Sequence, residues 1–232
     1  MISSGQTRRE SLEINNKATA IASGEQRVTL HHMSWASYEK ILEALGEGRS
    51  ARLKYYKGTL EIVVPLEAHE NASNLIDDFV KVVTEEGDLT IKSLQSTMLN
   101  KPELSAGAEP DQCFYLANEP LVRGKIVDLQ TDPPPDLVVE VDITHTDLNK
   151  NALYAALGIG EFWRYNGKVL RIYQLKDDEY QEVETSPNFP TIPKTRLYEF
   201  LRDCAEQGET AAKKQLRTWL REQLQNKGLG QT

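Results

Sequence analysis

Two acidic residues of the chain lie in predicted strands, where a buried charge needs a partner. Glu140 lies in the apolar run LVVEV at residues 137–141, and Asp111 follows a proline at the start of another predicted strand. Burying a charge is costly, so Glu140 must be paired, protonated or bound to a cation. If the two strands are neighbours, the carboxylates of Asp111 and Glu140 lie within reach of one cation.

The chemistry that such a pair supports is metal-assisted hydrolysis. Mg²⁺ (or Mn²⁺) prefers oxygen ligands and takes one or two carboxylates, with water and substrate phosphate as its other ligands. A cation held there would polarise a phosphodiester and activate an attacking water. Lys150, just after the strand of Glu140, is placed to orient that water and to balance anionic charge. The alternative from the residues alone is a structural ion pair between Glu140 and a Lys or Arg.

A central strand over residues 136–143 must present these acids. Five of its eight residues are Leu, Val or Ile, as expected of a strand that is covered on both faces. Alternation predicts that Glu140 and Asp142 point to one face and that Val139 and Val141 point to the other.

The helix expected after this strand must position Lys150. It should cover residues 148–157, with Asp147 as its N-cap. Lys150 and Tyr154 are four residues apart and therefore share a face of the helix. We expect Tyr154 to pack in the core beside the sheet.

Periodicity and turn residues predict an α/β arrangement around these two elements. Helices are expected over residues 34–46 and 69–86 and in two segments after residue 193. Strands are expected over residues 52–56, 59–64, 89–93, 111–116, 161–165, 168–174 and 179–184.

Composition excludes several classes of protein. The chain has 232 residues and a formal net charge of −8 at pH 7, so it has no global attraction to nucleic acid or anionic lipid, and any polyanion binding must be local. Two cysteines without metal-ligand spacing predict neither a zinc ribbon nor a disulfide framework. No apolar run approaches the roughly 20 residues that cross a bilayer, so we expect a cytoplasmic protein without a membrane partner.

The chain should divide into three segments. Residues 1–26 are polar and low in aromatic residues, which is typical of a flexible N-terminal tail. Residues 27–185 contain the α/β elements, and residues 186–232 begin as a proline-rich linker and continue as C-terminal helices. The last helix carries a basic run, which we interpret as a solvated face rather than a phosphate-binding stripe.

Several short motifs together resemble one family. In chain order they are Pro65 to Glu70, Pro110-Asp111, Pro135 to Val141, Asp147, Lys150, Tyr154, Gly158 and Glu161 to Trp163. This set is similar to the Uma-type endonucleases of the PD-(D/E)XK superfamily over about residues 30–175. The resemblance implies an α/β protein with a restriction endonuclease-like core, in which a mixed central sheet is flanked by helices, and here a C-terminal helical segment is added. It also implies a divalent metal bound by Asp111 and Glu140.

One position departs from the superfamily pattern, which has a lysine two residues after the glutamate. Asp142 occupies that position, and by resemblance Lys150 takes the role of the lysine. Asp142 could be a further ligand, a partner of Lys150 or a sign that the ancestral chemistry has drifted. The acid of the opening helix would be Glu70 or else Glu67, with His69 beside it able to bind metal or to shuttle a proton.

The leading hypothesis is therefore a Mg²⁺-dependent endonuclease that hydrolyses DNA. Its catalytic set would be Asp111, Glu140, Lys150, Glu70 and His69, with Asp111, Glu140 and Glu70 as metal ligands. One alternative is a catalytically degenerate protein of the same fold that binds nucleic acid or a protein partner. Another is a metallohydrolase of a small phosphorylated compound. A homodimer through the helices after residue 195 is a further expectation, because nucleases that cut both strands often pair two sites.

Overall fold

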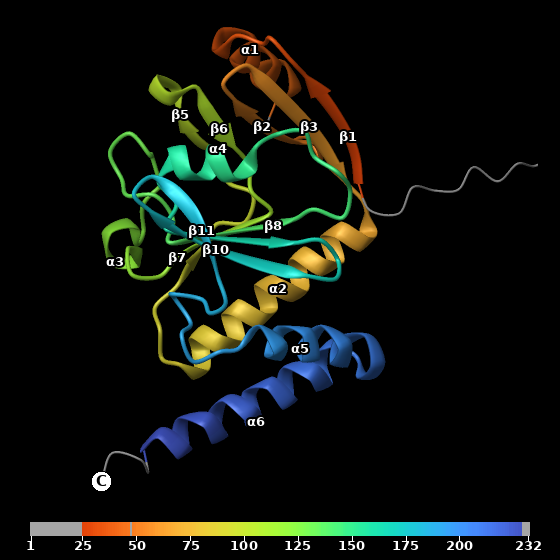
Figure 1. The fold of residues 1–232 in the computed structure, drawn as a ribbon, viewed down its shortest axis with the longest axis vertical. Coiled ribbons are helices and arrows are strands. Elements are labelled where there is room, and N and C mark those ends of the chain that lie inside the picture. The colour runs from red at the N-terminus through yellow and green to blue at the C-terminus, as the bar shows by residue number, and fades with distance from the viewer. Residues whose placement is uncertain (1–24, 47, 229–232) are drawn as a thin grey trace, which may run out of the picture.

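The computed structural model describes residues 25–46 and 48–228, which form two β-sheets with flanking helices (Figure 1). The strands of the first sheet are, in spatial order, β1 (Glu25–Leu30), β3 (Thr59–Pro65), β2 (Arg52–Tyr56), β6 (Ala106–Ala108) and β5 (Leu99–Lys101). All neighbouring strands of this sheet are antiparallel. The predicted tail at residues 1–26 lies outside the described residues except for Glu25 and Gln26, which begin β1.

The second sheet is mixed. Its strands are, in spatial order, β11 (Glu179–Val183), β10 (Leu170–Lys176), β9 (Glu161–Tyr165), β8 (Leu137–Val141), β7 (Gln112–Tyr115) and β4 (Lys92–Ser93). The neighbours β8 and β9 are parallel, whereas the other pairs are antiparallel. The predicted α/β class with a mixed central sheet is thus confirmed.

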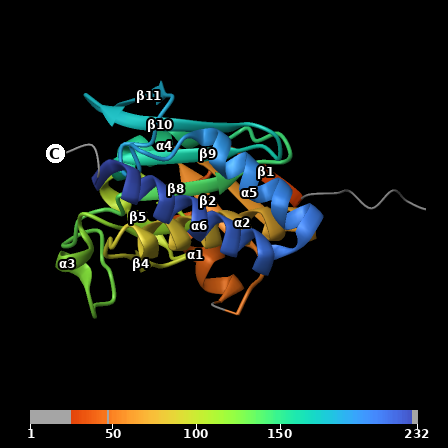
Figure 2. The same cartoon turned by 90° about the horizontal axis from the view of Figure 1, so that it is seen from below.

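Helices cover both faces of the second sheet. The helical elements are α1 (Trp35–Leu45), α2 (Glu67–Glu86), the 3-10 helix η1 (Pro102–Leu104), α3 (Glu119–Val122), α4 (Lys150–Leu157), α5 (Lys194–Gln207) and α6 (Glu209–Gly228). Helices α2, α5 and α6 lie on one side of this sheet, as Figure 2 shows from the side of α6. Helix α4 and the first sheet lie on the other side (Figure 1).

Strand β8 separates two hydrophobic clusters by its alternation. Val139 and Val141 belong to the cluster under α2, α5 and α6, whereas Val138 belongs to the cluster that includes α4. Glu140 and Asp142 share the face of Val138, as the sequence pattern predicted. The predicted alternation is therefore confirmed.

Two predicted details differ from the structure. Helix α4 begins at Lys150 and is capped by Asn149, whose Oδ1 accepts a hydrogen bond from the Ala152 N–H, so the predicted Asp147 cap is wrong. The cap forms two residues later than predicted, because the backbone of residues 142–149 is irregular and the helix begins only after it. The strand expected over residues 89–93 is reduced to β4, and β1, β5 and β6 were not predicted.

The C-terminal helices belong to the same core as the second sheet. Leu197 and Phe200 of α5 and Leu216 and Leu220 of α6 are buried in the cluster that contains α2. Because these apolar side chains are covered within the chain, they do not support the predicted homodimer contact.

The basic run of α6 pairs with acids of α2. Lys213 lies 2.8 Å from Asp78, and Arg217 lies 2.7 Å from Glu85. These pairs are partly exposed and hold α6 against α2, which leaves the run with a structural role.

In the part of the chain that the structure describes, no helix has both the length and the apolar character to cross a membrane.

Candidate active site

Asp111 and Glu140 come from neighbouring antiparallel strands. The register of β7 and β8 pairs Gln112 with Val139, so Asp111, one residue before β7, stands opposite Glu140. Opposed residues of such a pair project from the same face, with Cβ atoms about 4.5–5.5 Å apart. Asp111 is 2% exposed and Glu140 is 0% exposed. The structure thus brings the two sequence-predicted carboxylates together inside the protein.

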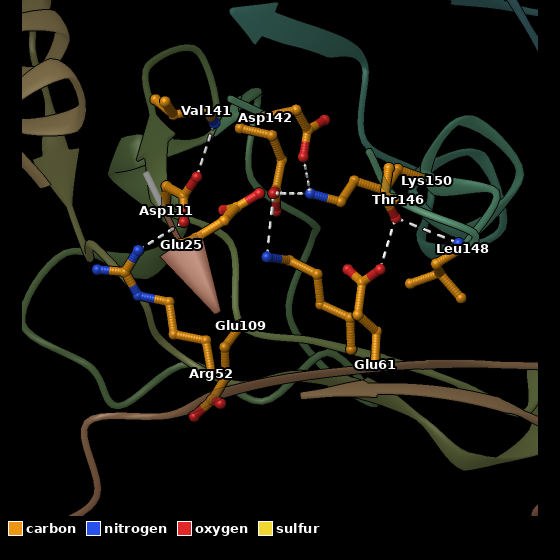
Figure 3. Close-up of polar contacts among 12 residues, drawn as sticks. Glu25, Arg52, Glu61, Glu109, Asp111, Val141, Asp142, Thr146, Leu148 and Lys150 are labelled. Atoms are coloured by element: carbon orange, nitrogen blue, oxygen red, sulfur yellow. Dashed lines mark hydrogen bonds and ion pairs between the residues drawn. The ribbon is translucent and has the colours of Figure 1, made fainter. Parts of the chain in front are cut away.

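Three donors hold Asp111 in place. Arg52 donates to Oδ1 at 2.6 Å, and the Val141 N–H donates to Oδ2 at 2.7 Å (Figure 3). His69 Nε2 lies 3.1 Å from Oδ2. Burial opposes ionisation, but Lys54, the hydrogen bond from His69 and the charge of Arg52 outweigh it and hold the pKa of Asp111 below its usual value. Asp111 is therefore a fixed, ionised carboxylate.

Glu140 is held by two lysines and a tyrosine. Lys150 Nζ donates to Oε2, and Lys54 Nζ lies 3.0 Å from the same oxygen. The hydroxyl of Tyr154 donates to Oε1. Tyr154 is thus a residue of the site as well as of the core, where the sequence placed it.

Lys150 joins the two acids of β8. It is the first residue of α4, is 1% exposed, and donates to both Glu140 and Asp142. Burial favours its neutral amine, but the charges of Glu140 and Asp142 prevail and raise the pKa of Lys150. The amine therefore stays protonated at neutral pH. It can donate hydrogen bonds and offset negative charge, and it cannot serve as a base.

Asp142 has two close cationic partners, and Arg27 lies farther away at 3.8 Å. Besides Lys150, Arg164 Nη2 lies 2.9 Å from Oδ2. Burial raises and the two cations lower the pKa of Asp142, and the net shift is downward. Of the three interpretations of Asp142, the geometry favours a partner of Lys150.

The residues predicted from the opening helix lie at different depths. His69 is buried, with its Nε2 directed at Asp111 and 3.5 Å from Glu25. Burial lowers and the Asp111 interaction raises the pKa of His69, and the net shift is upward. The Glu70 side chain is 39% exposed and reaches Asp111 only through Arg52, which lies 2.7 Å from it. Glu67 is exposed.

Lys54 was missed by sequence analysis. It reaches the site from β2 of the first sheet and is 1% exposed. In the register of β2 and β3 it stands opposite Glu61, which is also fully buried. This pair was a usable signal in the sequence, because Lys54 and Glu61 carry opposite charges at opposed positions of the predicted hairpin. The apolar residues that alternate with them mark the other face of the hairpin as core.

A second charged group extends the site toward β1. Arg27 forms ion pairs with Glu25 and Glu61 and lies 3.8 Å from Asp142. Thr146 donates to Glu61 at 2.6 Å, which ties the loop before α4 to the first sheet (Figure 3). Residues 25–30 carry little strand signal in the sequence, so this group could not be predicted.

The oxygen ligands that the site offers are of the kind that a divalent cation such as Mg²⁺ prefers. Asp111 and Glu140 offer only carboxylate oxygens, and one or two carboxylates are what Mg²⁺ usually takes from a protein. Across the described ranges, no group of three or more His, Cys, Asp or Glu side chains is arranged to hold a metal ion, so Glu70 does not join the other two. A cation bound here would compete with Lys54 and Lys150 for Glu140.

Two polar hollows flank the buried site. The first, here called the Glu70 hollow, has a volume of about 500 Å³, and its lining includes Arg49, Arg52, Glu70 and Glu109. The second, here called the Arg171 hollow, has a volume of about 370 Å³, and its lining includes Asp142, His145, Arg164, Asn166 and Arg171. Each contains a residue that contacts an acid of the site, since Arg52 contacts Asp111 and Arg164 contacts Asp142.

The mixed sheet with helices on both faces, and an acidic pair at its centre, define a restriction endonuclease-like α/β protein. Residues 35–202 match the Uma2 family, which is described as "Putative restriction endonuclease". The chain belongs to this family, and the predicted resemblance is confirmed. No curated protein matches the chain.

Proposed function

We propose that this protein is a divalent-metal-dependent endonuclease that hydrolyses phosphodiester bonds in DNA. Membership of the family suggests a nuclease. The observation that carries the proposal is the opposition of two buried carboxylates, Asp111 and Glu140, with the amine of Lys150 on one of them. Two carboxylates can hold the cation on which metal-assisted phosphodiester hydrolysis depends, and a lysine beside them can orient the attacking water.

Each residue has a separate role in this proposal. Asp111 and Glu140 would hold Mg²⁺ or Mn²⁺, which when bound supplies polarisation of the scissile phosphate and stabilisation of the departing oxygen. Lys150, kept protonated by its two acids, would orient the attacking water by donating a hydrogen bond. Tyr154 fixes the Glu140 carboxylate through its hydroxyl.

His69 and Glu70 act through Asp111 in this proposal. His69 donates toward Asp111 Oδ2 and keeps that carboxylate oriented and ionised. Glu70 holds the guanidinium of Arg52 against the other oxygen of Asp111. Both are therefore positioning residues, and the sequence-predicted role of Glu70 as a direct ligand is not favoured, because Glu70 reaches Asp111 through Arg52.

The test is cleavage of plasmid DNA by the purified chain in Mg²⁺, in Mn²⁺ and in EDTA. We expect the parent to cut only with a divalent ion and Glu140→Gln to lose at least about 100-fold in rate, the scale of a group acting at the reacting atoms. Glu182→Gln, an exposed residue of β11, is the matched control and should cut like the parent. Circular dichroism establishes that each variant is folded, and Asp111→Asn supplies an independent second variant. Cleavage that persists in both site variants would contradict the proposal.

A second candidate function is a nucleic-acid-binding module without hydrolysis. One observation favours it: all four oxygens of Asp111 and Glu140 already contact protein donors. Calorimetric titration with Mg²⁺ or Mn²⁺ separates the two functions. Saturable uptake by the parent that Glu140→Gln abolishes supports the nuclease, whereas DNA binding without uptake and without cleavage supports the module.

A further inference from the structure

Four residues form one row across four neighbouring strands of the second sheet. Asp111 stands opposite Glu140, Glu140 is the register partner of Arg164, and Arg164 is the register partner of Arg171. Register partners project from the same face of a sheet. The face that carries the candidate active site is thus acidic at one end of this row and basic at the other.

The basic end places two like charges directly opposite one another. Arg164 on β9 and Arg171 on β10 are antiparallel partners, whose Cβ atoms lie about 5 Å apart, and opposed like charges are destabilising in a sheet. Arg164 is compensated by Asp142, and its Nη1 also donates to Asn151 at 3.3 Å.

Arg171 has no such compensation. It is exposed, and within the described part of the chain it forms no ion pair and no side-chain hydrogen bond. The acid nearest to it in the register of β10 and β11 is Glu184, one residue past the last paired position. The Glu184 side chain is 91% exposed and lies 3.4 Å from Lys194 instead. Arg171 therefore presents an uncompensated cation to solvent.

The two hollows beside the site differ in charge. In the Glu70 hollow, Arg49 pairs with Glu109 at 2.5 Å and Arg52 pairs with Glu70, so two cations meet two acids. In the Arg171 hollow, two arginines meet one acid, Asp142, and that acid is also neutralised by Lys150. The exposed His145 lines the same hollow, and its Nε2 lies 3.2 Å from Asp147. Only the Arg171 hollow has an excess of positive charge.

We infer that the Arg171 hollow binds a backbone phosphate of the nucleic-acid substrate, with Arg171 as its donor and Arg164, held by Asp142 and Asn151, adding positive charge beside it. Arginine presents a planar fork of N–H groups that matches phosphate oxygens, and Arg171 has no acidic partner among the described residues to compete with the phosphate. The inference rests on the proposed function, which supplies the substrate. The Arg171 hollow also supplies the local basic surface that an acidic chain requires to approach DNA.

The spacing fits a phosphate near the one to be cut. Arg171 is two strands from Glu140, which is about 10 Å at about 4.8 Å per strand. Phosphates of one DNA strand follow each other with a rise of about 3.4 Å along the helix axis. The Arg171 hollow would therefore hold a phosphate within about three nucleotides of the scissile bond.

The test is binding of a fluorescein-labelled duplex oligonucleotide of mixed sequence, followed by anisotropy in EDTA over a range of salt concentrations. Arg171→Gln should weaken binding by about three- to tenfold and lower the slope of log K against log salt by about 0.9, the contribution of one phosphate contact. Arg202→Gln removes the same charge from an exposed position of α5 and should leave affinity and slope unchanged. Parent-like binding by Arg171→Gln, or an equal loss in Arg202→Gln, would overturn the inference.

A kinetic arm keeps this inference separate from the proposed hydrolysis. Arg171→Gln should raise KM for plasmid cleavage and leave kcat close to that of the parent, since the contact lies away from the reacting atoms. If Arg171→Gln weakens binding but no variant or parent cleaves DNA, the phosphate site stands and the hydrolytic function fails. If Glu140→Gln abolishes cleavage while Arg171→Gln keeps the KM of the parent, hydrolysis stands and the phosphate site fails.

Discussion

The two faces of the second sheet use the same strands for opposite purposes. Under α2, α5 and α6 the sheet presents Val139, Val141 and Trp163, which are buried among apolar side chains. On the face of α4 the neighbouring positions Glu140 and Arg164 are charged. Alternation within one strand is enough to build a core on one side and a charged site on the other. The apolar face therefore fixes the positions from which the charged side chains project.

Buried carboxylates behave differently on the two faces. Asp111 and Asp142, on the charged face, are matched by cations that lower their pKa despite burial. Glu161 lies on the apolar face, where Trp163 and Asn188 donate to it and no cation contacts it among the described residues. Burial raises the pKa of Glu161 more than the hydrogen bonds with Ser186, Trp163 and Asn188 lower it. Stability should thus depend on apolar contacts on one face and on charge matching on the other.

The largest expected effect on stability is at the apolar face. Phe200 of α5 is 0% exposed, and its ring centroid lies 5.7 Å from that of Phe79 on α2. Phe200→Ala should lower the free energy of unfolding by about 3–5 kcal/mol, measured by urea denaturation. DNA cleavage per folded molecule should be unchanged, because Phe200 lies across the sheet from Glu140.

The matched control for Phe200 is Leu224 on α6, whose side chain is 49% exposed. Leu224→Ala should change the free energy of unfolding by no more than about 0.5 kcal/mol. If folded Phe200→Ala lost cleavage as well as stability, the two faces would be coupled and the division of roles would be wrong.

On the charged face, Lys150→Met should affect both stability and cleavage. It leaves Glu140 and Asp142 with one cation fewer, and unpairing buried charges costs about 3–5 kcal/mol, with Lys54 and Arg164 keeping the loss near the lower value. Cleavage should fall at least about 100-fold. Urea denaturation and plasmid cleavage measure the two effects.

Two comparisons sharpen this second prediction. Lys168→Met, in the exposed turn between β9 and β10, should leave both quantities unchanged. The double variant Lys150→Met with Glu140→Gln should lose less stability than the sum of its single changes, because both charges are removed together. An additive loss would show that Lys150 and Glu140 do not stabilise each other.

The sequence predicted the fold where local patterns were strong. The run around Val139 predicted β8, and the Asn166-Gly167 turn predicted the hairpin of β9 and β10, because alternation and turn chemistry are local properties. Strands β5 and β6 have three residues each and depend on the pairing of β6 with β2 and of β5 with β6, which no local pattern reports. The start of α4 was misplaced because Asp147 and Asn149 are both good N-cap residues, and tertiary contacts decide between them.

The sequence predicted the acids of the site and missed their cations. Asp111 and Glu140 are conspicuous because each is an acid at a strand position, and the family motif contains both. Lys54 and Arg52 enter from the first sheet, so their proximity depends on how the two sheets pack. The proximity of Arg171 to the site required the register of three strands, which a sequence alone does not specify.

A pH titration tests the contrast between the buried carboxylates. The folded-state pKa of Glu161 is raised, so its contribution to stability is present below its unfolded pKa of about 4.3 and is lost as the pH rises through the folded value. Glu161→Gln removes this dependence. The free energy of unfolding of the parent relative to the variant should therefore decrease as the pH rises above about 4, by at most about 1.4 kcal/mol per pH unit. A cost of the amide that does not depend on pH shifts the curve of this free-energy difference against pH without changing its slope. If the free energies of unfolding of the parent and of Glu161→Gln changed with pH in parallel, the raised pKa of Glu161 would be contradicted.

The smallest expected effect is at the cap of α4, which links local structure to the site. The Asn149 side chain accepts a hydrogen bond from the Ala152 N–H at 3.0 Å, immediately before Lys150. Asn149→Ala should lower the free energy of unfolding by about 1 kcal/mol, and Asn149→Asp, which retains the capping oxygen, should cost less. Because Lys150 is anchored by Glu140 and Asp142 as well as by the helix, cleavage should fall by less in Asn149→Ala than in Lys150→Met. Equal losses of cleavage would mean that the helix start, rather than the charge network, sets the position of the amine.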